Sequence, residues 1–284
     1  MGIDSNVGAA GLVGEVARWF TRRAVSAAPA GCGVLTACDS AYFPGVQMLV
    51  CSLRGLIPIA VVDLGLDDVQ LGWLRARGAQ IAAVPAENWV AGRSVSMWQT
   101  WNKPTWCMAS PFECTLWLDA DTLVVGDLAE VWQLSAVDPL LIAHPDNGRE
   151  QSRNPDVLYD ALPVKQRLAH GAVQAGVIGL PAATSRRLLD RWAWCVSRVF
   201  KNTYPHTTAC WDQGALLWAA ERLELCDRVL SPAGVNRFVF ISDHVRRLGP
   251  VVLLDSLPLR ADDVVVHLAD RWKYWSDWGS YVAV

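Results

Sequence analysis

The stretch Cys114-Thr-Leu-Trp-Leu-Asp-Ala-Asp-Thr-Leu-Val-Val125 carries the strongest indication of fold in this sequence. Its opening residues form an apolar run, typical of a buried strand, that stops at Asp119. Because strand residues two apart point to the same face, we expect Asp119 and Asp121 to be neighbours. Ligands bind at the carboxyl edge of a parallel sheet, so the stretch predicts a ligand site where the strand ends.

The residues before this stretch alternate between apolar runs and helical segments. The expected strands are Gly33–Ala37, Ile57–Val62 and Ala79–Val84, and the expected helices are Gly45–Arg54 and a segment from Asp67 to Arg77. Asp67 can cap the second helix and Gly78 can end it. Strand, helix and strand in this order form a βαβ unit, and its repetition predicts a mainly parallel sheet.

The rest of the chain extends this pattern. We expect a short helix capped by Asp127 that runs through Trp132, strands at Leu140–Ala143, Ala172–Leu180 and Val264–His267, and helices at Ser185–Phe200 and Asp212–Leu223. Residues 1–30, with a helix at Val13–Ala24, are expected to form an N-terminal helical extension. Residues 31–284 are expected to form a single α/β domain with a central sheet flanked by helices, ending in an aromatic C-terminal tail.

Composition excludes several functional classes. Of the 284 residues, 52% are hydrophobic and 19% charged, and the net charge is −3. With no Lys/Arg run, the sequence does not favour nucleic-acid binding. No apolar stretch reaches the length of a membrane span. The sequence does not define the oligomeric state. The 8 cysteines lack C-x-x-C spacing, which favours free thiols and a cytoplasmic location.

The carboxylate pair indicates a divalent cation. Two adjacent carboxylates repel each other, and oxygen ligands of this kind suit Mg²⁺ or Mn²⁺, with diphosphate oxygens completing the shell. The alternative is a pair of turn-forming aspartates. It is less favoured, because an apolar strand that brings two acids together needs a compensating partner.

A second chemistry is also compatible with the pair. Asp119-Ala-Asp-Thr122 is similar to the Asp-x-Asp-x-Thr motif of haloacid-dehalogenase-like phosphatases, in which the first Asp attacks phosphate, although its Thr directly follows the second Asp. That motif normally opens such chains, whereas here a long βαβ pattern precedes it. The later acidic pair of those enzymes should follow a strand, but Asp262 and Asp263 precede one. We therefore keep the phosphatase as the alternative.

The segment Phe112–Trp132 resembles the central segment of GT-A (Rossmann-like) glycosyltransferases, closest to those of family 8. Lys103 precedes the acidic motif by an interval typical of that family. Further segments are similar to its motifs in the same order, namely Leu35-Thr-Ala-Cys-Asp39 with Tyr42, Gln174-Ala-Gly-Val177, Trp211-Asp-Gln-Gly214 and His267-Leu-Ala-Asp-Arg-Trp-Lys-Tyr-Trp275. The resemblance covers residues 33–275, and several motifs in order are more specific than any one alone.

The resemblance implies a metal site. Asp121 would bind the metal directly, Asp119 would bind it or a ribose hydroxyl, and His267 would be the third ligand through neutral imidazole. Outside the motif, a lone His after a strand is more often a structural residue. Lys273 would neutralise the leaving diphosphate, with a solvated surface charge as the alternative.

Donor contacts are implied for a further set: Thr36, Ala37, Asp39, Tyr42, Lys103, Asp119, Ala120, Gln174 and Lys273. Tyr42 would stack on the base and Asp39 would bind the base or ribose, although core packing explains Tyr42 equally well. Asp212, Gln213 and Lys273 are the implied catalytic residues. For Asp212, an N-cap of the following helix is an equal alternative to a contact with the sugar.

Three departures from the family pattern affect the sugar site. Asp270 replaces a Gly and Tyr274 a Pro in the closing motif, and Gln174 replaces an Asn. Asp270 adds negative charge where Gly allows close approach to a phosphate.

The implied function is a metal-dependent, retaining glycosyltransferase that uses Mn²⁺ or Mg²⁺. It would move a hexose-like sugar from a nucleotide-diphosphate donor, UDP-sugar in preference to GDP-sugar, to an acceptor small molecule or glycan. Besides the phosphatase, a non-catalytic homologue that binds sugar nucleotides remains open, supported only by Asp270 and Tyr274.

Overall fold

The computed structural model describes residues 25–84, 101–143, 173–197, 211–232, 234–240, 245–248, 251–254 and 260–269. The expected helix Val13–Ala24 lies outside these ranges, as do Asp270, Lys273 and Tyr274.

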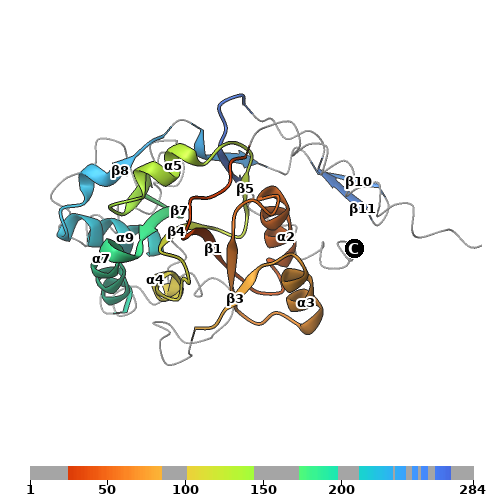
Figure 1. Ribbon diagram of the computed structural model, residues 1–284, viewed down its shortest axis with the longest axis horizontal. Coiled ribbons are helices and arrows are strands. Elements are labelled where there is room, and N and C mark those ends of the chain that lie inside the picture. Colours follow the sequence, from red (N-terminus) through yellow and green to blue (C-terminus); the bar gives the residue numbers. More distant parts are fainter. Residues whose placement is uncertain are drawn as a thin grey trace, which may run out of the picture.

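A central sheet of 7 strands organises the fold, in the order β3-β2-β1-β4-β7-β6-β8 (Figure 1). Its strands are β1 Cys32–Cys38, β2 Ile59–Asp63, β3 Gln80–Ala82, β4 Cys114–Leu118, β6 Leu140–Ala143, β7 Val173–Pro181 and β8 Val229–Leu230. Strand β7 runs antiparallel to both β4 and β6, and the remaining neighbours are parallel. This confirms the predicted α/β fold with a mainly parallel central sheet.

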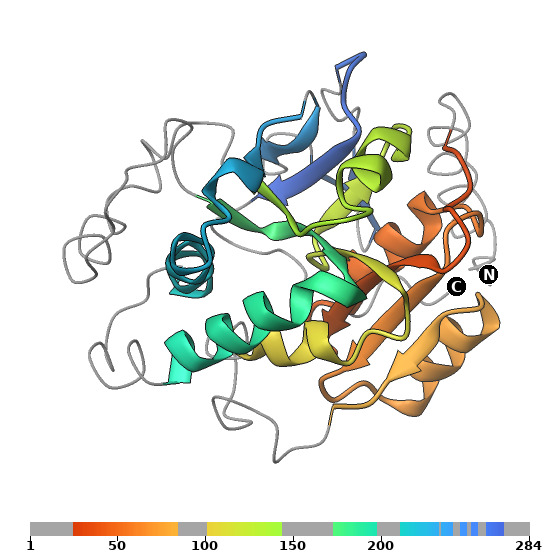
Figure 2. The ribbon, with the colours of Figure 1, turned by 60° about the vertical axis from the view of Figure 1, so that its left-hand side comes forward.

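Helices cover both faces of this sheet, which explains the continuous apolar runs of its strands. They are α2 Phe43–Ser52, α3 Asp68–Ala76, α4 Lys103–Met108, α5 Ala129–Leu134, α7 Ala182–Cys195 and α9 Trp211–Arg222, with a 3₁₀ turn at Cys226–Arg228. Val34 belongs to the core beneath α2 and α3, and its neighbour Leu35 belongs to the core beneath α7 and α9. Figure 2 shows α7 beside α4 and α9 on this second face.

A second sheet has the order β5-β12-β9. Its strands are β5 Thr122–Val124, β9 Val235–Phe240 and β12 Val265–Ala269. Only β12 was expected from the sequence. Strand β5 follows β4 after a short turn, so the chain passes directly from the central sheet into this second one. A separate hairpin joins β10 Val245–Leu248 to β11 Val251–Leu254.

The cap of α3 agrees with the sequence. The Asp67 carboxylate accepts the backbone N–H of Gln70 at 2.8 Å, and the Gln70 side chain accepts the backbone N–H of Asp67 at 3.0 Å. Gly78 follows the helix with a φ of +76°, a conformation that glycine adopts without a steric cost. Asp127 was expected to cap the next helix, but the N-cap position of α5 is Leu128, which makes no side-chain cap. Asp127 lies one residue earlier, where its carboxylate accepts the N–H of Ala129 at 3.0 Å.

Other boundaries differ from the prediction. Helix α2 begins at Phe43, before the expected Gly45, with Pro44 in its first turn, where proline needs no hydrogen bond. Helix α7 begins at Ala182 rather than Ser185. Helix α4 was not among the helices expected from the sequence, and it too has a proline, Pro104, in its first turn. No helix in the described ranges has both the length and the apolar character needed to cross a membrane.

Candidate metal and donor site

Asp119 and Asp121 lie on the turn between β4 and β5, not within one strand. Strand β4 ends at Leu118, and the Asp119 carbonyl accepts hydrogen bonds from the Thr122 N–H at 3.1 Å and the Thr122 hydroxyl at 2.7 Å. The sequence analysis expected the alternation of a strand to place the two aspartates side by side, and this reason was wrong. A hydrogen-bonded turn brings them together instead, because the chain changes sheets at this point.

Strand β12 brings His267 to this turn. His267 is opposite Thr122 in the antiparallel pair β5–β12, and the N–H of Leu268 donates to the Asp121 carbonyl at 2.8 Å. The Nε2 atom of His267 lies 3.0 Å from Oδ1 of Asp121, and both side chains are buried. Backbone pairing thus fixes the contact between two residues far apart in the sequence.

Asp119, Asp121 and His267 form a cluster whose ligand atoms all lie within 4.8 Å of one another. A small octahedral cation with bonds of about 2.1 Å holds neighbouring ligand atoms about 3.0 Å apart and opposite ones about 4.2 Å apart. The 3.0 Å between Oδ1 of Asp121 and Nε2 of His267 matches the separation of neighbouring ligands. Two carboxylates and one imidazole suit Mn²⁺ and also accept Mg²⁺, and three protein ligands leave positions for a substrate.

A buried lysine supports the cluster from helix α4. The ammonium of Lys103 lies 2.9 Å from Oδ1 of Asp119 and 2.9 Å from Oδ2 of Asp212, and it donates to the Ala175 carbonyl at 3.1 Å. These three contacts use all three donors of the ammonium group. Burial alone would lower the pKa of Lys103, but the two carboxylates raise it above its ordinary value, so the lysine is charged at neutral pH.

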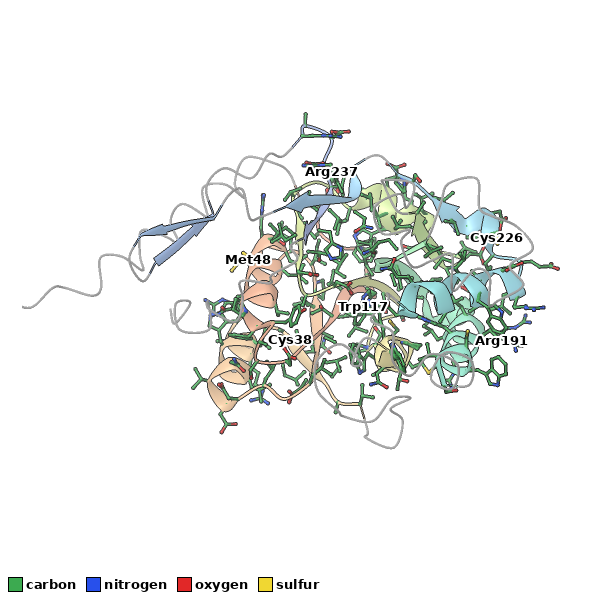
Figure 3. The ribbon with its side chains drawn as sticks, turned by 180° about the vertical axis from the view of Figure 1, so that it is seen from behind. Cys38, Met48, Trp117, Arg191, Cys226 and Arg237 are labelled. Carbon is green, nitrogen blue, oxygen red and sulfur yellow. The ribbon has the colours of Figure 1, made fainter. Side chains whose placement is uncertain are left out.

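Trp117 is a further partner of Asp119. Its indole Nε1–H donates to Oδ1 of Asp119 at 2.8 Å, and its ring stacks on Trp106 with centroids 6.2 Å apart. Figure 3 shows Trp117 near the middle of the molecule, whereas Arg191 lies at its periphery. The sequence analysis missed this contact, although a signal existed: Trp117 and Asp119 are two residues apart at a strand end.

Asp212 and Gln213 lie in the first turn of α9, which begins at Trp211. The Asp212 carboxylate pairs with Lys103, and its carbonyl accepts the indole N–H of Trp192 at 2.9 Å. Asp212 is buried and Gln213 is partly exposed. The carboxylate of Asp212 is thus directed at Lys103, which also binds Asp119 of the cluster.

The residues expected to contact the nucleotide lie at the carboxyl end of β1 and after it. Asp39 accepts the backbone N–H of Tyr42 at 2.9 Å, which shapes the turn before α2. Tyr42 is partly buried against the core beneath α2. Thr36 is fully buried, and its hydroxyl has no hydrogen-bond partner among the residues described. Ala37 is partly buried.

Gln174 lies on β7, and its side chain contacts His267 of the cluster. Its Oε1 accepts the backbone N–H of Gly176, and its Nε2 lies 3.3 Å from Nδ1 of His267. A Cβ atom on Gly176 would lie 2.7 Å from both the Gln174 Oε1 and the His267 Cε1. Glycine at this position therefore allows the glutamine and the histidine to meet.

Asn236 also contacts His267 and was missed by the sequence analysis. Its Oδ1 lies 3.3 Å from Nδ1 of His267, and the residue is fully buried. Asp263, in contrast, is occupied elsewhere: its carboxylate binds Arg237 at 2.7 and 2.5 Å and accepts the N–H of Arg260 at 2.6 Å. That pairing gives Asp263 a structural partner and weakens the phosphatase alternative.

Comparisons with known proteins identify the fold. No protein-family model matches the chain, and no curated protein matches it by sequence. Among solved structures, the chain is similar to glycosyltransferases. At the low identities found, this similarity shows the fold alone, and the fold is the GT-A glycosyltransferase fold.

Two solved structures illustrate the match. The chain aligns with the apo form of WbbM, a bifunctional glycosyltransferase, with a TM-score of 0.57 and 13% identity over 89% of this chain, but spans only 50% of that protein. It aligns with the galactosyltransferase LgtC, in complex with donor and acceptor sugar analogues, with a TM-score of 0.56 and 17% identity. That alignment covers 84% of this chain and 87% of LgtC.

Proposed function

We propose that the chain is a metal-dependent glycosyltransferase that moves a sugar from a nucleoside-diphosphate donor to an acceptor. The observation that carries this proposal is the cluster of Asp119, Asp121 and His267 at the carboxyl end of β4 in a GT-A fold. Membership of family 8, retention of anomeric configuration, a UDP-hexose donor and a cytoplasmic location belong to the same proposal, on the strength of the sequence motifs.

The roles of the three ligands follow from their contacts. Asp121 and His267 would hold the cation through Oδ1 and Nε2, which already face each other at 3.0 Å. Oδ1 of Asp119 is engaged by Lys103 and Trp117, so we assign its other oxygen to the cation or to a ribose hydroxyl. A bound divalent cation would stabilise the negative charge that develops on the departing diphosphate.

Lys103 acts in this proposal by orienting carboxylates instead of by contacting phosphate. Its three donors are used by Asp119, Asp212 and the Ala175 carbonyl. It therefore joins the metal site on the β4–β5 turn to the expected sugar site on α9. The positive charge of Lys103 is thus shared between the carboxylates of Asp119 and Asp212.

The sugar side is assigned to Asp212, Gln213 and Gln174. With Oδ2 of Asp212 held by Lys103, we assign its Oδ1 to sugar hydroxyls or to the anomeric centre, where positive charge develops in the transition state. Asp39, Tyr42, Thr36, Ala37 and Ala120 are assigned to the nucleotide. Lys273, outside the described residues, is assigned to the leaving diphosphate.

A panel of nucleotide sugars tests the proposal, with Mn²⁺ and then with a chelator. Thermal shift reports binding, and release of nucleoside diphosphate reports turnover. We expect one donor class to raise the unfolding temperature and to be consumed only with metal. Asp121→Ala should abolish the metal-dependent part, whereas Asp190→Ala, which removes an exposed carboxylate from α7, should not.

The remaining alternatives predict different results. A phosphatase would release inorganic phosphate from a phosphomonoester without an acceptor. A binding homologue would show the donor-dependent shift but no turnover with any acceptor. The absence of both shift and turnover across the panel would overturn the transferase proposal.

A further inference from the structure

Asn236 has an unusual backbone conformation next to a proposed metal ligand. Its φ is +64°, and among the described residues only Arg54 and Glu224 are other non-glycine residues with positive φ. Glycine adopts this conformation most easily, and asparagine tolerates it better than most residues do. The same residue forms a bulge in β9, because the register with β12 passes from Val235 directly to Arg237.

The bulge directs the Asn236 side chain at His267. Nδ1 of His267 lies 3.3 Å from Oδ1 of Asn236 and 3.3 Å from Nε2 of Gln174. The Gln174 amide is oriented by the Gly176 N–H, which can only donate, so Gln174 presents its NH₂ group to the ring. Nδ1 therefore faces one acceptor, Asn236, and one donor, Gln174.

Each of these partners suits a different tautomer of the ring. With a proton on Nε2, His267 donates to Asp121 at 3.0 Å, and Nδ1 accepts from Gln174. With a proton on Nδ1, His267 donates to Asn236, and the Nε2 lone pair is available to a cation. Both forms are neutral: the proton on Nε2 leaves and another is bound at Nδ1, so the ring gains no charge.

We propose that Asn236 is a positioning residue for the metal site, which it serves by accepting Nδ1–H of His267 and so turning Nε2 toward the cation. Gln174 holds the opposite tautomer when the metal is absent. The inference rests on the proposed function for its metal site, but not on any particular donor or acceptor. Ligating histidines commonly use their second nitrogen in this way, and loss of such a partner typically weakens metal binding 10–100-fold.

The conformation and surroundings of Asn236 are unfavourable for folding, which supports a functional role for this residue. Besides its positive φ, its Nδ2 is buried with no hydrogen-bond partner among the described residues. A glycine would remove both costs but would leave Nδ1 of His267 without an acceptor. Such strain at one buried residue is typical of functional sites.

Substitution of Asn236 separates a positioning role from a structural one. Asn236→Gly keeps the backbone conformation and removes the acceptor, and Asn236→Asp keeps an acceptor of the same length. Glu224→Gly is the matched control, since it replaces an exposed residue of similar φ away from the cluster. The full chain is titrated with Mn²⁺ alone by calorimetry, and the unfolding temperature is measured without metal.

We expect Asn236→Gly to bind Mn²⁺ about 10–100-fold more weakly while its metal-free unfolding temperature is unchanged or higher. Asn236→Asp should bind at least as tightly as the wild type, and Glu224→Gly should match the wild type. Mn²⁺ binding by Asn236→Gly within about twofold of wild type would overturn the proposal. If Asn236→Gly does not fold, Asn236→Asp tests the proposal instead. Weaker Mn²⁺ binding by Asn236→Asp than by the wild type would also overturn the proposal.

Nitrogen-15 NMR of the imidazole rings gives a second readout, with Mg²⁺ as a diamagnetic probe and His267→Gln for assignment. The protonated nitrogen of His267 should be Nε2 without metal and Nδ1 with it, and an unchanged tautomer overturns the assignment. The two proposals can fail separately. If Asp121→Ala loses Mn²⁺ binding and Asn236→Gly weakens it, but no sugar is transferred, only the transferase proposal fails.

Discussion

A Cβ atom added to Gly45 would lie 2.6 Å from the carbonyl oxygen of Ala120. Helix α2 and the turn that carries Asp119 and Asp121 therefore touch backbone to backbone. The contact is extended by Ser52, at the end of α2, whose hydroxyl accepts the N–H of Val124 at 3.1 Å. The position of the acidic pair thus depends on α2 as well as on β4.

Gly45→Ala should displace the acidic turn. A backbone carbonyl cannot move aside as a flexible side chain can, so we expect a loss of about 1–3 kcal/mol in the free energy of unfolding and weaker Mn²⁺ binding. Urea unfolding and a Mn²⁺ titration measure the two effects. An unchanged titration would show that the turn does not depend on α2.

Gly72→Ala is the control for this substitution. Gly72 is an exposed residue inside α3, and nothing lies within 4 Å of an added Cβ atom. Alanine is the better helix former, so the change should stabilise the chain by about 0.5–1 kcal/mol and leave Mn²⁺ affinity unaltered.

Lys103→Met should destabilise the protein strongly. It leaves the buried Asp212 and the partly buried Asp119 without their shared cation, and breaking a buried pair by removing one partner costs about 3–5 kcal/mol. Denaturant unfolding measures the loss. Arg186→Met breaks an exposed pair with Asp190 on α7 and should cost less than about 0.5 kcal/mol. Equal losses for the two variants would contradict the structural role of Lys103.

Alkaline pH should weaken the same network. The carboxylates of Asp119 and Asp212 raise the pKa of Lys103 above its ordinary value of 10.5, so the folded chain binds this proton more tightly than the unfolded chain. Its contribution is fully present below pH 10.5 and is lost as pH rises through the folded pKa. Within that window, deprotonation of Lys103 lowers the free energy of unfolding by about 1.4 kcal/mol per pH unit.

Unfolding from pH 8 to pH 11 compares the wild type with Lys103→Met. Burial also raises the pKa of the Cys38 and Cys107 thiols, so both proteins should lose stability above about pH 9. Near pH 11, the free energy of unfolding of the wild type should fall more steeply with pH than that of the variant. Parallel curves would show that the ammonium does not titrate with folding.

Local sequence patterns predicted the central sheet well because its determinants are local. Strand β4 has the bounds Cys114–Leu118 expected from its apolar run, and the cap at Asp67 marks the start of α3. The second sheet was mostly missed. Strand β5 is short, and its pairing with β12 joins residues far apart in the sequence, which periodicity does not reveal.

The sequence singled out the three side chains that cluster, Asp119, Asp121 and His267, but not the contacts that support them. The order of the motifs along the chain indicated Asp121 and His267, and in the structure Oδ1 of Asp121 lies 3.0 Å from Nε2 of His267. The three contacts of Lys103 depend on α4, β7 and α9 packing together, and no spacing in the sequence encodes that arrangement. Asn236 depends on a bulge and a positive φ, and neither has a signature in the chain around it.

Two tryptophans allow the hydrogen bond to Asp119 to be measured by itself. Trp117→Phe removes the Nε1–H that donates to Asp119 at 2.8 Å, whereas Trp132→Phe removes a buried Nε1–H with no partner among the described residues. Both changes lose similar volume from the core, so the difference between them reports the hydrogen bond lost at Trp117 together with the unpaired donor removed at Trp132. A hydrogen bond to a charged group contributes about 1.5–3 kcal/mol, so Trp117→Phe should be the more destabilising variant by at least about this amount in urea unfolding. It should also weaken Mn²⁺ binding, since Oδ1 of Asp119 would lose one of the two groups that orient its carboxylate. If the two variants were equally stable, the indole of Trp117 would act only through packing, and the orientation of Asp119 would rest on Lys103 alone.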